Sequence, residues 1–342
     1  MTSLATLSAL PTDFAIPLRD NMIISLKGEQ SDSYLHGQIT VNVNKLSEGN
    51  ARHYAHCDNK GKTWSVGYVM RHKDALLMLT NADAGAHSLA QLNKYGVFSK
   101  VDITDATNDF TAILISQSAA SKLLGDIFPT TDFSHLPPSW ESNSSLFAAN
   151  SEYGVVFNSG FQRGAVIAVL TKEAAQRVMS RLEEQQVCEY DQVVFNALQI
   201  ESAHATLDEE NVAEYVPQMI NMHALHAIDF DKGCYMGQEV VARTRFLGKN
   251  KRAAYPFKLS ESVEISSQET LEKQLGDNWR VAGKIISSAT LANETWLMAV
   301  LTNDTQSQDL HRLTGNHEIT CYPIDLPYDI EQQASNIVRK RR

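Results

Sequence analysis

The first third of the chain alternates short apolar runs with turn residues. These runs predict strands at residues 22–26, 52–57, 64–71 and 75–80. The apolar spacing after the first strand predicts a short helix. Asn81 or Asp83 can cap a second helix that ends near Tyr95, because a side-chain oxygen there accepts hydrogen bonds from the free amides of the first turn. We therefore predict an N-terminal α+β lobe over residues 1–108.

A second unit of mixed periodicity follows over residues 109–190. Apolar runs predict strands at 110–115, 154–157 and 165–170. Helices are predicted at 118–128 and after Thr171, which is expected to cap the second helix. A polar stretch around Pro137 and Pro138 predicts an exposed connection. The order of elements is compatible with a ferredoxin-like α+β lobe, in which helices cover one side of a mainly antiparallel sheet.

The rest of the chain changes character twice. Residues 191–248 open with a predicted helix whose apolar face carries Val194, Phe195, Leu198 and Ile200. Short strands are then predicted at 253–259, 280–287, 296–301 and 318–324. They indicate a small β-barrel over residues 249–330. The basic tail, residues 331–342, is expected to be exposed and is assigned no function.

Composition and charge narrow the classes of function. The chain has 342 residues, 43% of them hydrophobic, which is enough to bury a substantial core. Its apolar runs are far shorter than the roughly 20 residues that span a bilayer, so no membrane association is expected. A net charge of -10 argues against direct contact with nucleic acid. No basic or long apolar leader precedes Arg19, so a cytoplasmic location is expected.

The sequence shows no convincing pattern of metal ligands. Reduced cytosolic thiols are indicated by the wide spacing of the four cysteines, Cys57, Cys188, Cys234 and Cys321. On a strand, His53 and Cys57 share one face while His56 points to the other, so the three side chains do not converge. The acidic segment 208–214 lacks the glycine turn of a calcium-binding loop. We therefore predict no metal site.

The segment richest in special residue types runs from Lys232 to Glu239. Its glycines, Gly233 and Gly237, allow an unusual backbone path or the close approach of a ligand. A helix can begin after them, and its positive end, with Lys232 nearby, favours the thiolate form of Cys234. Cys234 is therefore the candidate catalytic residue, as a nucleophile, a redox centre or a transient soft-metal ligand. The competing interpretation is a small core cysteine in a glycine turn.

The same segment carries a family resemblance. It matches Lys-Gly-Cys-Tyr-x-Gly-Gln-Glu, the signature of YgfZ proteins and their mitochondrial iron-sulfur assembly relatives, at Lys232, Gly233, Cys234, Tyr235, Gly237, Gln238 and Glu239. The likeness continues through Gly37 to Thr40, Ala55 to Asp58, Lys60 to Lys62, Lys94 to Val101 and Asn250 to Arg252. The chain thus resembles the YgfZ family, which is related to the glycine-cleavage T-protein. This resemblance implies an α+β fold of the T-protein-like cloverleaf type, with two α+β lobes and a C-terminal β-barrel around a central folate pocket.

Tetrahydrofolate, or a related folate, is the cofactor that the resemblance implies. Its recognition needs a carboxylate or amide for the polar edge of the pterin, an aromatic surface for the ring, and a cation for the glutamate tail. Glu201 matches the acidic residue of the superfamily pattern Leu-x-x-Glu-x-Gly that faces the pterin, although Ala203 replaces the glycine. Asn21 and Phe195 occupy positions where some YgfZ proteins place tryptophan, and of these Phe195 can stack. Arg243 is a candidate for an anionic group or for a structural salt bridge.

The expected function is support of other enzymes. T-proteins use an aspartate shortly after a Gly-Gly turn, whereas residues 60–65 contain no carboxylate, so aminomethyltransferase activity is not expected. An iron-sulfur cluster is normally held by four cysteine thiolates, and only Cys234 lies in a motif suited to exposing one. A permanently bound iron-sulfur cluster is therefore not expected either. The resemblance implies a folate-binding protein that supports iron-sulfur cluster assembly or repair in client enzymes such as tRNA methylthiotransferases. It thereby implies a role in tRNA modification, with regulatory effects on replication initiation.

Two other functions stay open at this stage. One is a folate-dependent one-carbon transferase with an unknown acceptor. The other is a noncatalytic adaptor that uses the loop around Cys234 to dock its partners.

Overall fold

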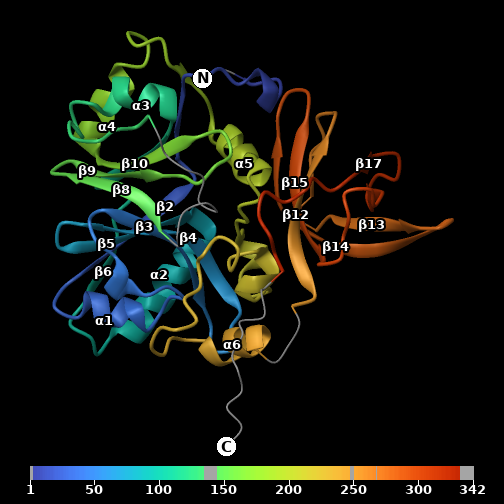
Figure 1. Cartoon of the computed structure of the whole chain (residues 1–342), viewed down its shortest axis with the longest axis horizontal. Helices are drawn as coiled ribbons and strands as arrows, with labels where there is room; N and C mark the ends of the chain where they lie inside the picture. Colours follow the sequence, from blue (N-terminus) through green and yellow to red (C-terminus); the bar gives the residue numbers. More distant parts are fainter. Residues whose placement is uncertain (1–2, 135–144, 247–249, 267, 332–342) are drawn as a thin grey trace, which may run out of the picture.

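A computed structural model describes residues 3–134, 145–246, 250–266 and 268–331. Two lobes share one large sheet, and a C-terminal β unit lies on the other side of helix α5 (Gln192–Glu201) (Figure 1). The connection predicted around Pro137 and Pro138 and the basic tail from residue 332 lie outside the described residues.

The first lobe is an antiparallel sheet with its helices packed against one face. In sheet order its strands are β3 (Asn50–Cys57), β4 (Thr63–His72), β5 (Ala75–Asn81), β2 (Asn21–Lys27) and β6 (Asp102–Asp105). Its helices are α1 (Ser31–His36) and α2 (Ala82–Gly96). The four predicted strands are confirmed, and Asn81 caps α2 by accepting a hydrogen bond from the Asp83 amide. The strand β6 was not predicted because it is mostly exposed and has no apolar run.

The second lobe continues the same sheet. In sheet order its strands are β11 (Cys188–Glu189), β1 (Phe14–Pro17), β7 (Phe110–Ser116), β10 (Ala165–Thr171), β9 (Gly154–Asn158) and β8 (Leu146–Ser151). The helices α3 (Gln117–Leu124) and α4 (Lys172–Ser180) bury their apolar sides together on one face. Helix α4 begins after Thr171 as predicted, although the Thr171 side chain makes no capping hydrogen bond. Pairing of Ala51 on β3 with Leu146 on β8 joins the two lobes into one 11-stranded sheet.

The C-terminal unit is a curled six-stranded sheet. Its strand order is β12 (Arg252–Leu259), β15 (Thr295–Thr302), β14 (Asn278–Thr290), β13 (Thr270–Leu275), β16 (His311–Leu313) and β17 (Thr320–Cys321). A bridge between Phe257 on β12 and Pro323, just after β17, brings the two edges together. This closure agrees with the predicted small barrel. The strand predicted at 318–324 is reduced to β17 and this bridge.

The segment between the lobes and the barrel supplies the central elements. It contains α5, two 3-10 helices (Glu209–Asn211 and Pro217–Ile220) and α6 (Gln238–Phe246). The apolar side of α5 packs in the large core that runs from the sheet to the barrel. Within the described ranges, no helix is long and apolar enough to cross a bilayer.

Candidate functional site

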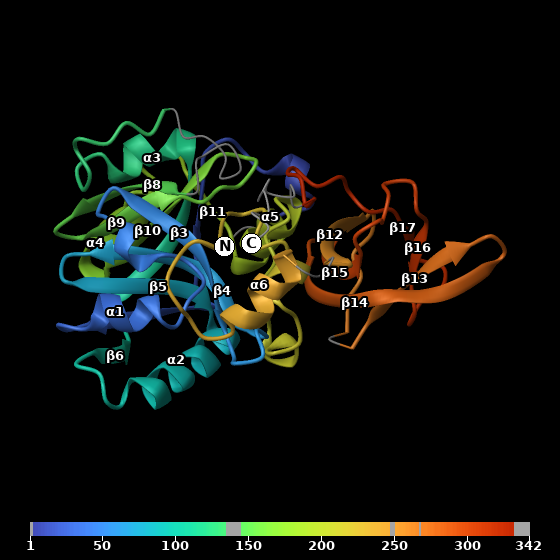
Figure 2. The same ribbon diagram turned by 60° about the horizontal axis from the view of Figure 1, so that its bottom comes forward.

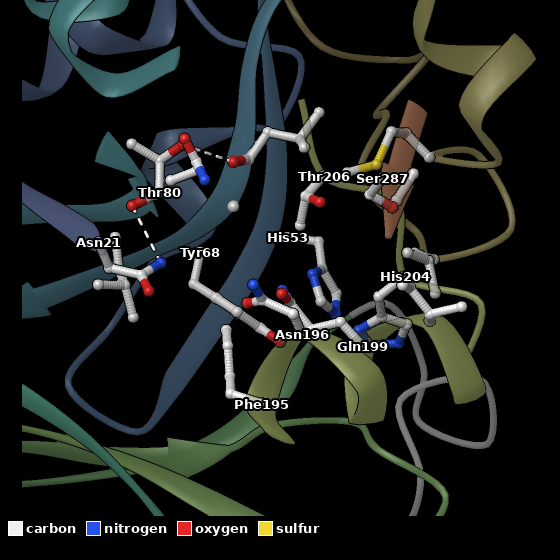
Figure 3. Close-up of a pocket in the computed structure, with 18 of the residues that line it drawn as sticks. Asn21, His53, Tyr68, Thr80, Phe195, Asn196, Gln199, His204, Thr206 and Ser287 are labelled. Carbon is white, nitrogen blue, oxygen red and sulfur yellow. Dashed lines mark hydrogen bonds between the residues drawn. The ribbon is translucent and has the colours of Figure 1, made fainter. Parts of the chain in front are cut away.

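A pocket lies where α5 faces the first lobe and β14 (Figure 3). One stripe of α5 lines it at helical spacing, with Gln192, Phe195, Asn196, Gln199 and Ile200. The sheet contributes Asn21, His53, Tyr68 and Thr80, and His204 and Ser287 complete the lining. The pocket is therefore assembled from side chains that are far apart in the sequence.

The lining of this pocket mixes polar and apolar side chains and carries no formal charge. No Asp, Glu, Lys or Arg is among the described residues that line it. Side-chain amides form a short network, because the Gln192 Nε2 donates to Asn21 Oδ1 and to Asn196 Oδ1, both at 3.1 Å. The Asn21 Nδ2 in turn donates to the Thr80 carbonyl at 3.1 Å. Such a lining favours hydrogen bonding to a neutral polar ligand over the pairing of charges.

Two buried histidines stand at one end of the pocket. The rings of His53 and His204 meet edge to face, with centroids 5.0 Å apart. Burial lowers the pKa of His204 to about 3. Burial also places the pKa of His53 well below its usual value, and the neighbouring His204 and Arg52 act in the same direction. Both imidazoles are therefore neutral at physiological pH.

Contacts with residues outside the pocket hold its aromatic side chains in place. The Tyr68 hydroxyl donates to the Ser159 carbonyl at 2.9 Å. The ring of Phe195 is 1% exposed and lies against Phe161, with centroids 5.7 Å apart. Of the sequence-predicted folate contacts, Phe195 thus lines the pocket. Asn21, which was not predicted as a contact, lines it too.

The other predicted contacts lie elsewhere. The Glu201 carboxylate accepts hydrogen bonds from Arg163 Nε and from Arg163 Nη2, each 2.7 Å long, and Glu201 does not appear in the described lining of the pocket. This position follows from helical geometry, because Glu201 is off the stripe that continues from Asn196 to Gln199. Arg243 lies on α6 and pairs with Glu239 one turn earlier, both side chains being mostly exposed. Of the two roles predicted for Arg243, the structure therefore shows the salt bridge.

The motif loop, which we define as Lys232 to Glu239, is anchored by its lysine. The Lys232 Nζ donates to the carbonyl oxygens of His36 at 2.5 Å, Ile39 at 2.6 Å and Val41 at 2.9 Å. The ammonium also lies 4.8 Å from the centroid of the Tyr235 ring. Burial lowers the pKa of Lys232 to about 7, while the nearby Asp229 opposes that shift. Lys232 thus holds the loop against the segment that follows α1, a role that the sequence did not indicate.

The glycines of the motif loop allow a second close contact. Gly237 has φ +82°, and a Cβ on it would lie 2.5 Å from the Asp58 carbonyl oxygen and 2.8 Å from the Gly61 Cα. Gly61, with φ +71°, would meet Val240 in the same way. The loop and the start of α6 therefore pack directly on the turn between β3 and β4, as Figure 2 also shows. Only glycine fits both the backbone conformation and the space.

Cys234 lies in the exposed part of this anchored loop. Its side chain is a free thiol, and α6 begins four residues later at Gln238. The core-cysteine interpretation therefore does not apply to Cys234. Cys234 is absent from the described lining of the pocket, so the loop and the pocket are two distinct features.

Sequence reasoning missed His53, His204, Asn196 and Gln199 as pocket residues. The helical period was a usable signal for the last two, because Asn196 and Gln199 share the stripe of Phe195. No local signal links His53 with His204, which are brought together only by the packing of the segment after α5 on β3.

Known proteins show the same architecture. The glycine cleavage system aminomethyltransferase T from Bartonella henselae superposes with a TM-score of 0.71, covering 94% of this chain and 87% of that chain at 13% identity. This similarity establishes the predicted T-protein-like fold. Residues 250–316 match the family model described as the YgfZ beta-barrel domain.

Curated relatives match over nearly the whole chain. The tRNA-modifying protein YgfZ of Colwellia psychrerythraea is 35% identical over 302 residues, which cover 88% of this chain and 89% of that protein. The protein of the same name from Yersinia enterocolitica is 32% identical over 336 residues, covering 96% of each chain. Together with the barrel match and the T-protein-like fold, this similarity shows that the chain belongs to the YgfZ family.

Proposed function

We propose that this protein binds a folate in the central pocket and supports iron-sulfur enzymes that modify tRNA. The observation that carries the proposal is the uncharged lining of amides and aromatic rings inside a T-protein-like fold. The curated relatives are named tRNA-modifying proteins, which supports the second half of the proposal. A cytoplasmic location and an effect on replication initiation stay predictions from the family resemblance.

The described side chains fit the ring of a folate better than its tail. The amides of Asn196 and Gln199 can pair with the polar edge of a pterin, whereas Phe195, at 1% exposed, packs within the pocket wall. The carboxylates of the glutamate tail find no lysine or arginine in the described lining, so the tail is expected to extend toward the solvent. Bound tetrahydrofolate would supply one-carbon or redox chemistry that the protein side chains lack. The protein itself holds the ring, orients it and limits the access of water.

A transferase role receives less support from the pocket. Transfer at a folate nitrogen needs a group that positions the amine and moves a proton. The lining has neutral histidines and no carboxylate among its described residues, and the Asp58 carboxylate is used to cap the β3–β4 turn at the Lys60 and Lys62 amides. We therefore favour a supporting role for Cys234, whose exposed thiol on an anchored loop is suited to a transient ligand or redox step with a client enzyme.

Calorimetry with tetrahydrofolate tests the binding half of the proposal. The wild-type protein is expected to show saturable binding near one site per chain. Replacing both ring-facing amides, Asn196→Leu with Gln199→Leu, is expected to weaken binding at least tenfold. A wild-type protein without measurable tetrahydrofolate binding would reject the folate site and favour the adaptor function.

The methylthiolated nucleosides of tRNA test the client half. A strain that lacks this protein is complemented with wild type, Cys234→Ser or Cys188→Ser, and the nucleosides are measured by mass spectrometry. Cys188 is the matched control, because it is also an exposed free thiol but lies on β11 in the second lobe. Loss of methylthiolation with Cys234→Ser alone supports the proposed role of the thiol. Full methylthiolation with Cys234→Ser would refute it.

A further inference from the structure

The histidine pair at the end of the pocket has unused hydrogen-bonding capacity. His53 is 5% exposed and His204 is 4% exposed. In the described part of the chain, His53 Nε2 and both ring nitrogens of His204 have no hydrogen-bond partner. The Ser287 hydroxyl, at the same end of the pocket, also has no partner among the described residues. In Figure 3, His53 and His204 lie together, and Asn21 lies at the other side of the pocket.

Unpaired nitrogens of this kind are costly inside a protein. A buried polar group without a partner costs about 1–3 kcal/mol, and folded proteins leave few of them. Aromatic rings lie next to both histidines. The ring centroids of Tyr68 and His53 are 4.6 Å apart, and those of Phe161 and His204 are 5.3 Å apart. Such neighbours pack against the imidazoles without satisfying their nitrogens. A polar ligand that reaches these nitrogens from the pocket would satisfy them.

The chemistry of the pair restricts that ligand. A neutral imidazole offers one N–H donor and one acceptor, so the pair can serve a ligand edge that carries both a donor and an acceptor. A carboxylate or phosphate prefers cationic donors, and the described lining provides none. The best match is the amide-like edge of an uncharged heteroaromatic ring.

We propose that His53 and His204 are the specificity-determining pair of the pocket, and that they hydrogen-bond the uncharged donor-acceptor edge of a heteroaromatic ring ligand. This inference rests on the proposed folate function, in which the pterin supplies that edge. In this arrangement the two histidines and the α5 amides together recognise the ring, and the histidines make no contact with the anionic tail.

Binding measurements on the full chain test the proposal with three probes. The probes are tetrahydrofolate, 6-methyltetrahydropterin for the ring alone, and p-aminobenzoylglutamate for the tail alone. His53→Phe and His204→Phe are each expected to weaken binding of the first two probes at least tenfold and to leave the third within twofold. His72→Phe is the matched control, because His72 is also 5% exposed but lies outside the pocket lining. Unchanged tetrahydrofolate binding by both folded pocket variants would overturn the proposal.

Histidine ring nitrogen signals give a second readout that needs no variant. In wild-type protein labelled with nitrogen-15, the pterin probe is expected to shift the ring signals of His53 and His204 and to leave those of His72 in place. If tetrahydrofolate fails to bind but the pterin probe moves these signals, the folate function is rejected and the histidine assignment stands. If neither compound affects the two histidines, both proposals fail.

Discussion

Acidification from pH 7 to pH 5 is expected to destabilise the ligand-free protein through its buried histidines. His56 and His204 are both buried, and burial lowers the pKa of each to about 3. The unfolded chain binds a proton at each site near pH 6.5, whereas the folded protein does not until pH 3. The unfolded state therefore binds more protons between these values, and stability falls as the pH falls through this window. Above about pH 7 the two sites contribute no pH dependence.

The magnitude follows from the width of that window. At pH 5, each site lies about 1.5 units below the unfolded pKa, which corresponds to about 2 kcal/mol per histidine. The two sites together are expected to cost about 4 kcal/mol at pH 5, out of a typical total of about 5–15 kcal/mol. Burial also lowers the pKa of His53, His72, His223 and His226, so these residues act in the same direction.

Urea unfolding at pH 7, 6 and 5, followed by circular dichroism, measures this effect. The double variant His56→Gln with His204→Gln is expected to lose about 4 kcal/mol less than wild type between pH 7 and pH 5. His317→Gln is the control, because the His317 side chain is 59% exposed. Equal pH dependence in the wild type and the double variant would refute the assignment of this acid sensitivity to the buried histidines.

Three further predictions concern the motif loop. Lys232→Met is expected to lower the free energy of unfolding by about 2–4 kcal/mol, because three carbonyl oxygens lose their donor. The same variant is expected to speed the reaction of Cys234 with Ellman's reagent. An unchanged unfolding midpoint would contradict the anchoring role of Lys232. In urea unfolding, Gly237→Ala is expected to lower the stability of the protein more than Gly276→Ala does. Both glycines have positive φ, but only at Gly237 would a Cβ lie against backbone atoms. Equal losses of stability in the two variants would mean that the close packing contributes nothing. Saturating tetrahydrofolate is expected to change the rate at which iodoacetamide alkylates Cys234 by less than twofold. The rate is measured by mass spectrometry, with Cys188 as the reference. Strong protection of Cys234 would show that a bound folate covers the thiol.

The strands of the first lobe were predictable because their signals are local. The run 75–80 and the cap at Asn81 each depend on neighbouring residues, and the structure contains both. The strand β1 has no such signal, since its four residues are ordered by pairing with β7 and β11, roughly 100 and 170 positions away in the chain. Continuity of the sheet across the lobes likewise depends on a pairing of β3 with β8 that no local pattern encodes.

The same limit applies to the functional residues. Cys234 was accessible to sequence reasoning because glycines and a helix start surround it in the chain. The anchoring of Lys232 was not, because its acceptors are backbone carbonyls near residue 40, which carry no side-chain signature. Glu201 was chosen from a sequence pattern, and the helical phase of α5 turns it toward Arg163 instead of the pocket. Side-chain chemistry was therefore easier to predict than the direction in which a side chain points.

The sheet places the pocket and the motif loop at separate positions along the same pair of strands. His53 lines the pocket from β3, and Cys57 ends that strand four residues later on the same face, a span of about 13 Å at about 3.3 Å per residue. The turn on which the motif loop packs begins only after Cys57. Cys234 does not belong to the described lining of the pocket, so we expect the folate and the thiol to act at separate steps. Any coupling between them has to pass through the β3–β4 hairpin, which contacts the pocket at Tyr68 and the loop at Gly61.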